Sequence, residues 1–117
     1  MPRRPSDLSA ACMDSLDEHM DPELFQALCD PVRVALIAHL ASSGRPLTVT
    51  EAGECCGIHF SGVSRHLAVL RRAGVVRAEK HGREVHYALE ATALVGTLRS
   101  LADALESCWE EGRRAAS

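Results

Sequence analysis

The chain has 117 residues, a length that suits one small domain and is too short for two. Aromatic residues make up only 3% of it, so a core has to come mainly from Leu, Val, Ile and Ala. The net charge is −3, no apolar run is long enough to cross a membrane, and the N-terminal segment lacks the continuous apolar stretch of a secretory signal. We therefore expect a cytoplasmic protein built mainly from helices.

The first part of the chain predicts helices with clear starting points. Residues 1–20 are weakly patterned and indicate a short helix or a mobile arm. Asp21-Pro22 and Asp30-Pro31 each mark a helix start, because Asp caps free backbone amides and Pro tolerates the first helical position. After the second start, apolar residues recur on one helical face until Gly44 ends the helix: Val32, Leu36, Ile37 and Leu40.

The middle of the chain predicts a helix-turn-helix. Thr48 and Glu51 fit a capping box at the start of a short helix that we expect to run to about Cys56. Gly57 then breaks it and Gly74 ends a second helix. The first helix needs small residues against the second, which Ala52 and Gly53 supply, and the second has three inward positions: Val63, Leu67 and Leu70.

The last third predicts a hairpin and a long helix. Residues 75–80 and 83–88 read as two strands around His81-Gly82. A helix over 90–113 has an apolar stripe that is long enough to pair with a second copy: Leu94, Leu98, Leu101, Leu105 and Cys108. The predicted fold is mainly α with a small β-hairpin, a winged helix-turn-helix that dimerises through its terminal helices. Its parts are an arm or short helix (1–20), the DNA-binding and dimerisation domain (21–113) and a tail (114–117).

Charge is unevenly distributed along the chain. Residues 61–88 contain six basic and two acidic residues, a net charge of +4, so the remainder carries −7. A local basic patch on an acidic body is typical of a DNA-binding protein, because the contact face must neutralise phosphates. On charge alone, an ordinary solvated face remains the alternative.

Four motifs together resemble the ArsR/SmtB family: residues 27–33, 63–67, 70–76 and 82–87. The resemblance covers about residues 22–107 and implies a homodimeric repressor that leaves its operator DNA when a metal, metalloid or oxidant reaches it. Two recognition helices related by a two-fold axis would read an inverted repeat. The resemblance implies DNA contacts in the second helix, and the basic wing adds phosphate contacts. The predicted DNA-binding residues are Ser61, Gly62, Ser64, Arg65, His66, Arg71, Lys80 and Arg83.

The sensor site is predicted from the cysteines. The positions of the family's arsenic-binding cysteines hold Thr48 and Thr50 here, and residues 90–117 contain no His, so the family's histidine-containing zinc site is absent as well. The five cysteines are an odd number, which argues against a disulfide framework in a cytosolic chain. Thiolates favour soft ions such as As(III), Cd(II) or Hg(II). The predicted metal ligands are Cys55, Cys56 and Cys108, Cys12 is an optional further ligand, and Cys29 is expected in the core.

Three alternatives to this reading remain open. The same cysteines would also serve a repressor that senses thiol oxidation, or they are simply buried. A winged helix that binds only proteins is the third. An enzyme is not expected, because the sequence has no Gly-rich phosphate loop, nucleophile motif or paired catalytic carboxylates.

Overall fold

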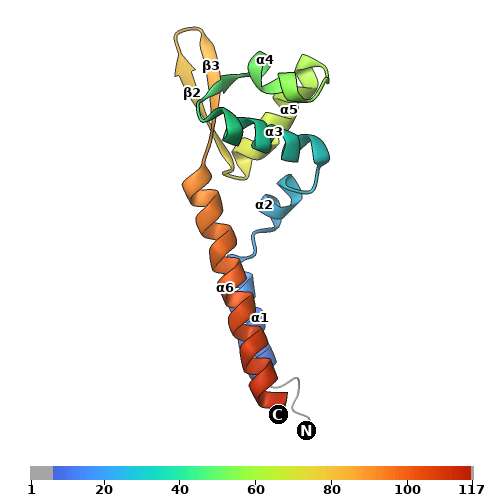
Figure 1. The fold of residues 1–117 in the computed structure, drawn as a ribbon, viewed down its shortest axis with the longest axis vertical. Helices are drawn as coiled ribbons and strands as arrows, with labels where there is room; N and C mark the ends of the chain where they lie inside the picture. Colours follow the sequence, from blue (N-terminus) through green and yellow to red (C-terminus); the bar gives the residue numbers. More distant parts are fainter. Residues whose placement is uncertain (1–6, 117) are drawn as a thin grey trace. The chain divides into compact units, whose positions relative to one another are not determined.

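The computed structural model describes residues 7–116, and residues 1–6 and 117 lie outside the description. The chain divides into two compact units, one made of residues 22–94 and the other of residues 1–21 with 95–117. The elements, in chain order, are α1 (Asp7–His19), α2 (Pro22–Ala27), α3 (Pro31–Ser43), β1 (Leu47–Thr48), α4 (Val49–Ala52), the 3-10 turn η1 (Gly53–Cys55), α5 (Phe60–Arg72), β2 (Val76–His81), β3 (Glu84–Leu89) and α6 (Ala91–Ala116) (Figure 1).

Two of the predicted helix caps are confirmed, those at Asp30 and at Thr48. One carboxylate oxygen of Asp30 accepts hydrogen bonds from the backbone N–H groups of Val32 (2.8 Å) and Arg33 (3.3 Å) at the start of α3. The backbone N–H of Glu51 donates to the Thr48 hydroxyl (3.2 Å), and the Glu51 carboxylate accepts from the Thr48 N–H (3.0 Å). Both caps satisfy amides that a helix start otherwise leaves without a partner.

The first helix of the helix-turn-helix is shorter than expected. It ends at Ala52 and continues as the 3-10 turn η1, so the prediction of one helix to about Cys56 is wrong. Glycine has a low helix propensity, and Gly53 stands where the change occurs. A Cβ atom at Gly53 would lie 2.8 Å from Cγ2 of Val63, so this glycine also allows α5 to pack closely. Gly57 makes the following turn with a φ of +63°.

The sheet has a third strand that the sequence did not reveal. β1 pairs antiparallel with β3, which pairs antiparallel with β2, in the order β1-β3-β2. Two residues are too few to show the alternation by which a strand is recognised. The hairpin strands begin one residue later than predicted, because the pairing runs from Val76 with Leu89 to His81 with Glu84. At the far end, Val85 is 40% exposed, whereas Ala88 is buried near the base.

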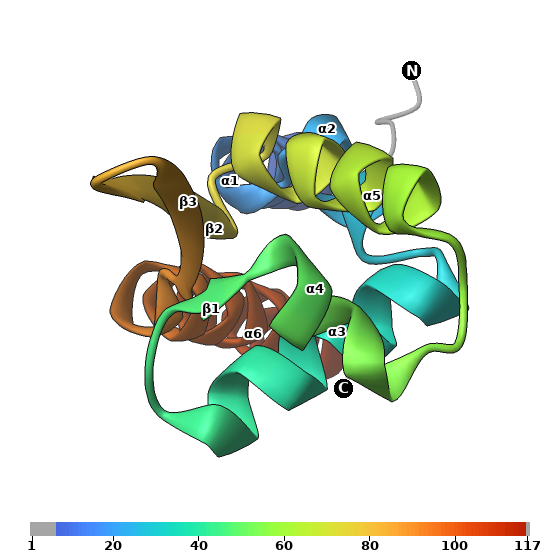
Figure 2. The ribbon, with the colours of Figure 1, turned by 90° about the horizontal axis from the view of Figure 1, so that it is seen from above.

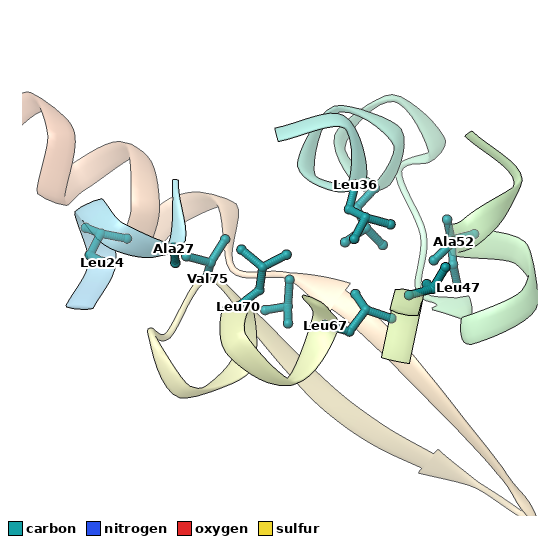
Figure 3. Close-up of a cluster of buried hydrophobic side chains, with 11 residues drawn as sticks. Leu24, Ala27, Leu36, Leu47, Ala52, Leu67, Leu70 and Val75 are labelled. Atoms are coloured by element: carbon teal, nitrogen blue, oxygen red, sulfur yellow. The ribbon is translucent and has the colours of Figure 1, made fainter. Parts of the chain in front are cut away.

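One apolar core holds the unit of residues 22–94 together. In Figure 3, Leu36 of α3 and Leu67 and Leu70 of α5 lie in this core, and all three are fully buried. Figure 2 shows α5 on one side of this unit and α3 and α4 on the other. The inward positions predicted for α5 are confirmed, which leaves the opposite face of α5 for solvent.

The other unit contains α1 and most of α6. Along α6, Leu101, Ala104 and Cys108 are half-buried or buried, at the three- and four-residue spacing of one helical face. A different face of α6 is exposed, and we name it the outer stripe: Val95, Leu98, Leu105 and Trp109. The stripe predicted from the sequence is thus divided between two faces. In residues 7–116, no helix has the length and apolar character needed to span a membrane.

Candidate nucleic-acid interface

α5 is built as a two-faced helix. Its buried face anchors it to the core, and Arg65 lies on the exposed side. His59 caps its start, because His59 Nδ1 accepts a hydrogen bond from the Ser61 N–H at 3.2 Å and lies 3.0 Å from the Ser61 hydroxyl. Phe60, the first residue of α5, is 58% exposed. An exposed, capped helix start is the part of a recognition helix that enters the major groove.

The structure places the predicted DNA-binding residues on α5 and at the tip of the β2–β3 hairpin. Gly62, Ser64 and His66 are half-buried. The other five are exposed: Ser61, Arg65, Arg71, Lys80 and Arg83. These eight positions all belong to the unit of residues 22–94, so the helix and the wing are parts of one body.

Four of these side chains are cations without a carboxylate partner. Within the described part of the chain, no ion pair involves Arg65, Arg71, Lys80 or Arg83. By contrast, Arg77 contacts Glu79 at 2.8 Å and Glu90 at 3.0 Å, so this residue of the basic segment is already neutralised. The positive charge available to phosphates therefore lies on α5 and at the tip of the wing.

His66 is held by a residue that the sequence did not single out. Arg33 of α3 donates from Nε to the carbonyl of Ala27 (2.7 Å) and from Nη2 to that of Gln26 (3.1 Å), and its Nη1 lies 3.2 Å from His66 Nδ1. Arginine can only donate, so Nδ1 must accept and the ring proton must be on Nε2. Arg33 thereby orients the His66 ring and leaves Nε2 as its donor.

The partner of Arg33 at the helix cap is also part of this arrangement. Asp30 lies 3.9 Å from Arg33 Nη1. Partial burial raises the pKa of Asp30, but hydrogen bonds from the N–H groups of Val32 and Arg33, together with the positive charge of Arg33, outweigh burial and hold the pKa below its usual value. The carboxylate therefore stays ionised and remains paired with Arg33 in the first turn of α3. The motif of residues 27–33 contains Asp30 and Arg33, but no local pattern reveals a contact with a residue 33 positions away.

The hairpin brings two histidines together near its tip. The rings of His81 and His86 are stacked with centroids 4.4 Å apart. His81 Nε2 lies 3.1 Å from Glu79, and His86 Nε2 lies 3.2 Å from Glu84. The hydrogen bond from His81, followed by that from Arg77, lowers the pKa of Glu79 despite partial burial. The carboxylates of the wing thus have their own partners and leave the side chains of Lys80 and Arg83 unpaired.

The cysteines form two pairs. Cys55 and Cys56 are in hydrogen-bond contact at the end of the 3-10 turn, and burial, followed by the contact with Cys55, raises the pKa of Cys56 to about 11. The Cys55 thiol donates to the carbonyl of Ala52 at 3.4 Å. Cys108 belongs to the other unit, where its partner is Cys12. Within the described residues of one chain, no group of three or more His, Cys, Asp or Glu side chains is arranged to hold a metal ion.

The three predicted ligands therefore do not belong to one unit. Cys55 and Cys56 lie in the unit of residues 22–94, and Cys108 lies in the other. Cys56 packs against the core, and Cys55 is exposed. Cys29 is exposed and donates to the carbonyl of Phe25 at 3.1 Å, so the expectation of a core cysteine is wrong. It lies two residues after the short helix α2, whose buried residues are Leu24 and Ala27.

Known proteins resemble this chain in sequence and in fold. Residues 28–79 match a helix-turn-helix domain family. The chain is 34% identical to the uncharacterised HTH-type transcriptional regulator YceK of Bacillus subtilis over 76% of this chain and 93% of YceK. It is 33% identical to the transcriptional repressor SmtB homolog of Synechocystis sp. over 79% of this chain and 69% of that protein.

The structural likeness agrees with the sequence. A crystal structure of an ArsR family transcriptional regulator, RHA00566, superposes with a TM-score of 0.64 at 31% identity and covers 75% of this chain and 93% of its own. These relatives are DNA-binding transcriptional regulators and not enzymes. Together with the capped recognition helix and the hairpin wing, they show that the chain belongs to the ArsR/SmtB family of winged helix-turn-helix transcriptional regulators.

Proposed function

We propose that the protein is a homodimeric repressor that binds an inverted-repeat operator in the cytoplasm and leaves it when a soft metal or metalloid ion binds cysteine thiolates. The observation that carries the DNA-binding part is the set of unpaired cations on α5 and the wing, in one compact unit. The exposed Arg65 would read a base, because an arginine fork fits the acceptor edge of guanine in the major groove. Lys80 and Arg83 would contact phosphates beside the groove.

The outer stripe supports the proposal that the protein is a dimer. Its four large apolar side chains are between 39% and 65% exposed in the single chain. Large exposed apolar side chains that share one helical face mark an interaction site in a soluble protein. A second copy is the partner that fits, since a two-fold axis lets the same stripe serve both subunits and presents two recognition helices to an inverted repeat. The half-sites should then lie about one helical turn, ~34 Å, apart.

The positions of the thiols support the proposal that a soft ion is the inducer. Cys55 and Cys56 lie between α4 and α5, the two elements of the helix-turn-helix, so an ion bound there acts beside the recognition helix. With Cys108 they would supply three thiolates, which suit As(III), Cd(II) or Hg(II) better than hard ions. The name of the Synechocystis relative, a transcriptional repressor, supports repression as the outcome of binding.

A comparison of Arg65 with the wing tests the DNA-binding assignment. Arg65→Ala should weaken operator binding by about 1–3 kcal/mol and relax preference at one base pair, because it removes a base contact. Lys80→Ala and Arg83→Ala should weaken binding to all sequences alike and reduce the slope of log K against log salt by about one each. Fluorescence anisotropy at four salt concentrations, with operator and scrambled duplexes, measures both effects. Arg77→Ala is the matched control, because its charge is already paired. Unchanged affinity in the first three variants would contradict the assignment.

The contact between Arg33 and His66 gives a second expected result. Arg33→Ala should lower operator affinity about tenfold, because the loss of a charged hydrogen-bond donor frees the His66 ring. A double-mutant cycle with His66→Ala should show that the two losses do not add, since both remove the same oriented donor. Binding is measured by anisotropy, and circular dichroism checks that α3 is intact. Additive losses would show that Arg33 does not act through His66.

A further inference from the structure

An aromatic side chain at the start of α5 is not among the predicted DNA-binding residues. The chain has two phenylalanines. Phe25 packs against the apolar core, whereas Phe60, the first residue of α5, is 58% exposed. Ile58, two residues earlier, also packs against the core. Core packing therefore explains Phe25 and Ile58 but gives no reason for a phenylalanine at position 60.

Phe60 belongs to the part of α5 that a recognition helix presents to bases. It directly precedes Ser61 and lies one helical turn before Ser64, so it shares a side of the helix with Ser64. The cap by His59, whose Nδ1 accepts from the Ser61 N–H at 3.2 Å, orders the first turn. An ordered first turn gives the Phe60 side chain a defined position at the entry to the groove.

Two hollows flank Phe60, and neither is suited to a phosphate. One, of about 330 Å³, lies between the start of α5 and the wing, and its lining includes Glu84 and Val85. The other, of about 230 Å³, lies beside α4 and η1, and its lining includes Glu54. Each hollow thus has a carboxylate, and among the described residues no Lys or Arg lines either of them. A carboxylate repels a phosphate, so the partner of Phe60 has to be an uncharged group.

The major groove of DNA offers an apolar group at one kind of base. Thymine exposes its C5-methyl group there, whereas the groove edges of adenine, guanine and cytosine are read through hydrogen-bond donors and acceptors. A phenyl ring cannot hydrogen-bond to those groups, and it would take them out of water without a partner. An exposed phenylalanine at the groove therefore favours thymine both by contact and by excluding the other bases.

We propose that Phe60 selects thymine in each half-site of the operator, with its ring packed against the C5-methyl group. The proposal rests on the proposed function, because it requires the start of α5 to enter the major groove. It adds an apolar base contact to the polar contact expected of Arg65, and it involves no cysteine and no bound ion. Since the two subunits of a two-fold dimer are equivalent, the selected thymine should occur at the same position in both half-sites.

Replacement of thymine by deoxyuridine tests the contact, because it removes the methyl group and keeps the base pair. The probe is a duplex that the unmodified full-length chain selects from a random pool, with its thymines replaced one symmetric pair at a time. At one pair the affinity should fall about fourfold per half-site, the equivalent of ~0.8 kcal/mol for one methyl group. The loss for both half-sites together should then be about 15-fold. Phe60→Ala should bind the thymine and deoxyuridine duplexes equally at this pair, as measured by fluorescence anisotropy.

Val85→Ala is the matched control. Val85 is an exposed apolar side chain of the same hollow, but it belongs to the wing, so this variant should keep the full difference between thymine and deoxyuridine. Phe60→Leu keeps an apolar side chain and should retain part of the difference. Circular dichroism and sedimentation without DNA should show that Phe60→Ala has the fold and the oligomeric state of the unmodified protein.

The possible results separate this proposal from the proposed function. A difference that persists in Phe60→Ala, or a selected duplex in which no thymine is sensitive, would overturn the thymine contact and leave the repressor proposal intact. A changed oligomeric state of Phe60→Ala without DNA would also overturn it, because Phe60 would then lie between subunits. A chain that selects no duplex at all would contradict both this proposal and the proposed function.

Discussion

Glutamates at Leu98 and Leu105 should convert the protein into a monomer that no longer binds its operator. The two leucines are 39% and 57% exposed in the single chain and lie on the outer stripe. In a two-fold dimer each charge would be buried, and an unpaired buried carboxylate is strongly unfavourable. A monomer can occupy only one half-site, so affinity for the full operator should fall by about 100-fold or more. Sedimentation equilibrium at micromolar concentration and a gel shift measure the two effects.

The control for this variant is a charge elsewhere on the same helix. Ser107 is exposed and lies on the side of α6 opposite the outer stripe. Ser107→Glu should therefore leave both dimerisation and operator binding unchanged. If the Leu98→Glu, Leu105→Glu variant sediments as a dimer, the subunits meet through another surface and the outer stripe has a different partner.

Local interactions explain the parts of the fold that could be predicted from the sequence. The Asp30 and Thr48–Glu51 caps involve residues within three positions of one another, and the structure contains both. The inward face of α5 follows from one helical period and is also confirmed. These features depend only on neighbours along the chain, so the sequence displays them directly.

The features that sequence analysis missed depend on contacts between distant segments. β1 is a strand only because β3 lies beside it. The break after Ala52 reflects the approach of Val63 to Gly53 as much as the helix propensity of glycine. On α6, a spacing of alternating three and four residues places leucines on a broad arc, and packing decides which of them remain exposed.

The candidate site divides in the same way. The exposed cations of α5 and the wing could be predicted, because charge and helical period locate them without knowledge of packing. The orientation of His66 by Arg33 joins residues 33 positions apart, and the pairing of Cys12 with Cys108 joins the two ends of the chain. Cysteine counting indicated which residues could bind an ion, but only the fold shows which thiols are neighbours.

Replacing Cys55 and Cys56 by Ser should separate ion sensing from DNA binding. The double variant should bind the operator like the unmodified protein, because neither thiol belongs to α5 or to the wing. It should lose the release that As(III), Cd(II) or Hg(II) causes. That release is expected to be about 5- to 150-fold in affinity, the range of a coupling of ~1–3 kcal/mol between linked sites. Anisotropy of a labelled operator, with and without each ion, gives the comparison.

The dependence on pH provides a second readout of the same site. The pKa of Cys56 is about 11, so at neutral pH this thiol must lose a proton to bind the ion. The ion concentration needed for release should therefore fall as the pH rises, by about tenfold per pH unit for each proton displaced. Release should need less ion at pH 7.5 than at pH 6.5, whereas operator binding without ion should change much less.

Two further variants identify which thiols act. Cys29→Ser is the matched control, since Cys29 is exposed and bonds only to the Phe25 carbonyl, and its response should be that of the unmodified protein. Cys108→Ser should abolish the response if the three predicted ligands bind one ion together. An oxidant that releases the operator without metal, and whose effect a thiol reductant reverses, would favour redox sensing through the same residues. If the Cys55→Ser, Cys56→Ser variant responds to every ion and oxidant like the unmodified protein, these two cysteines only fill space beside the recognition helix.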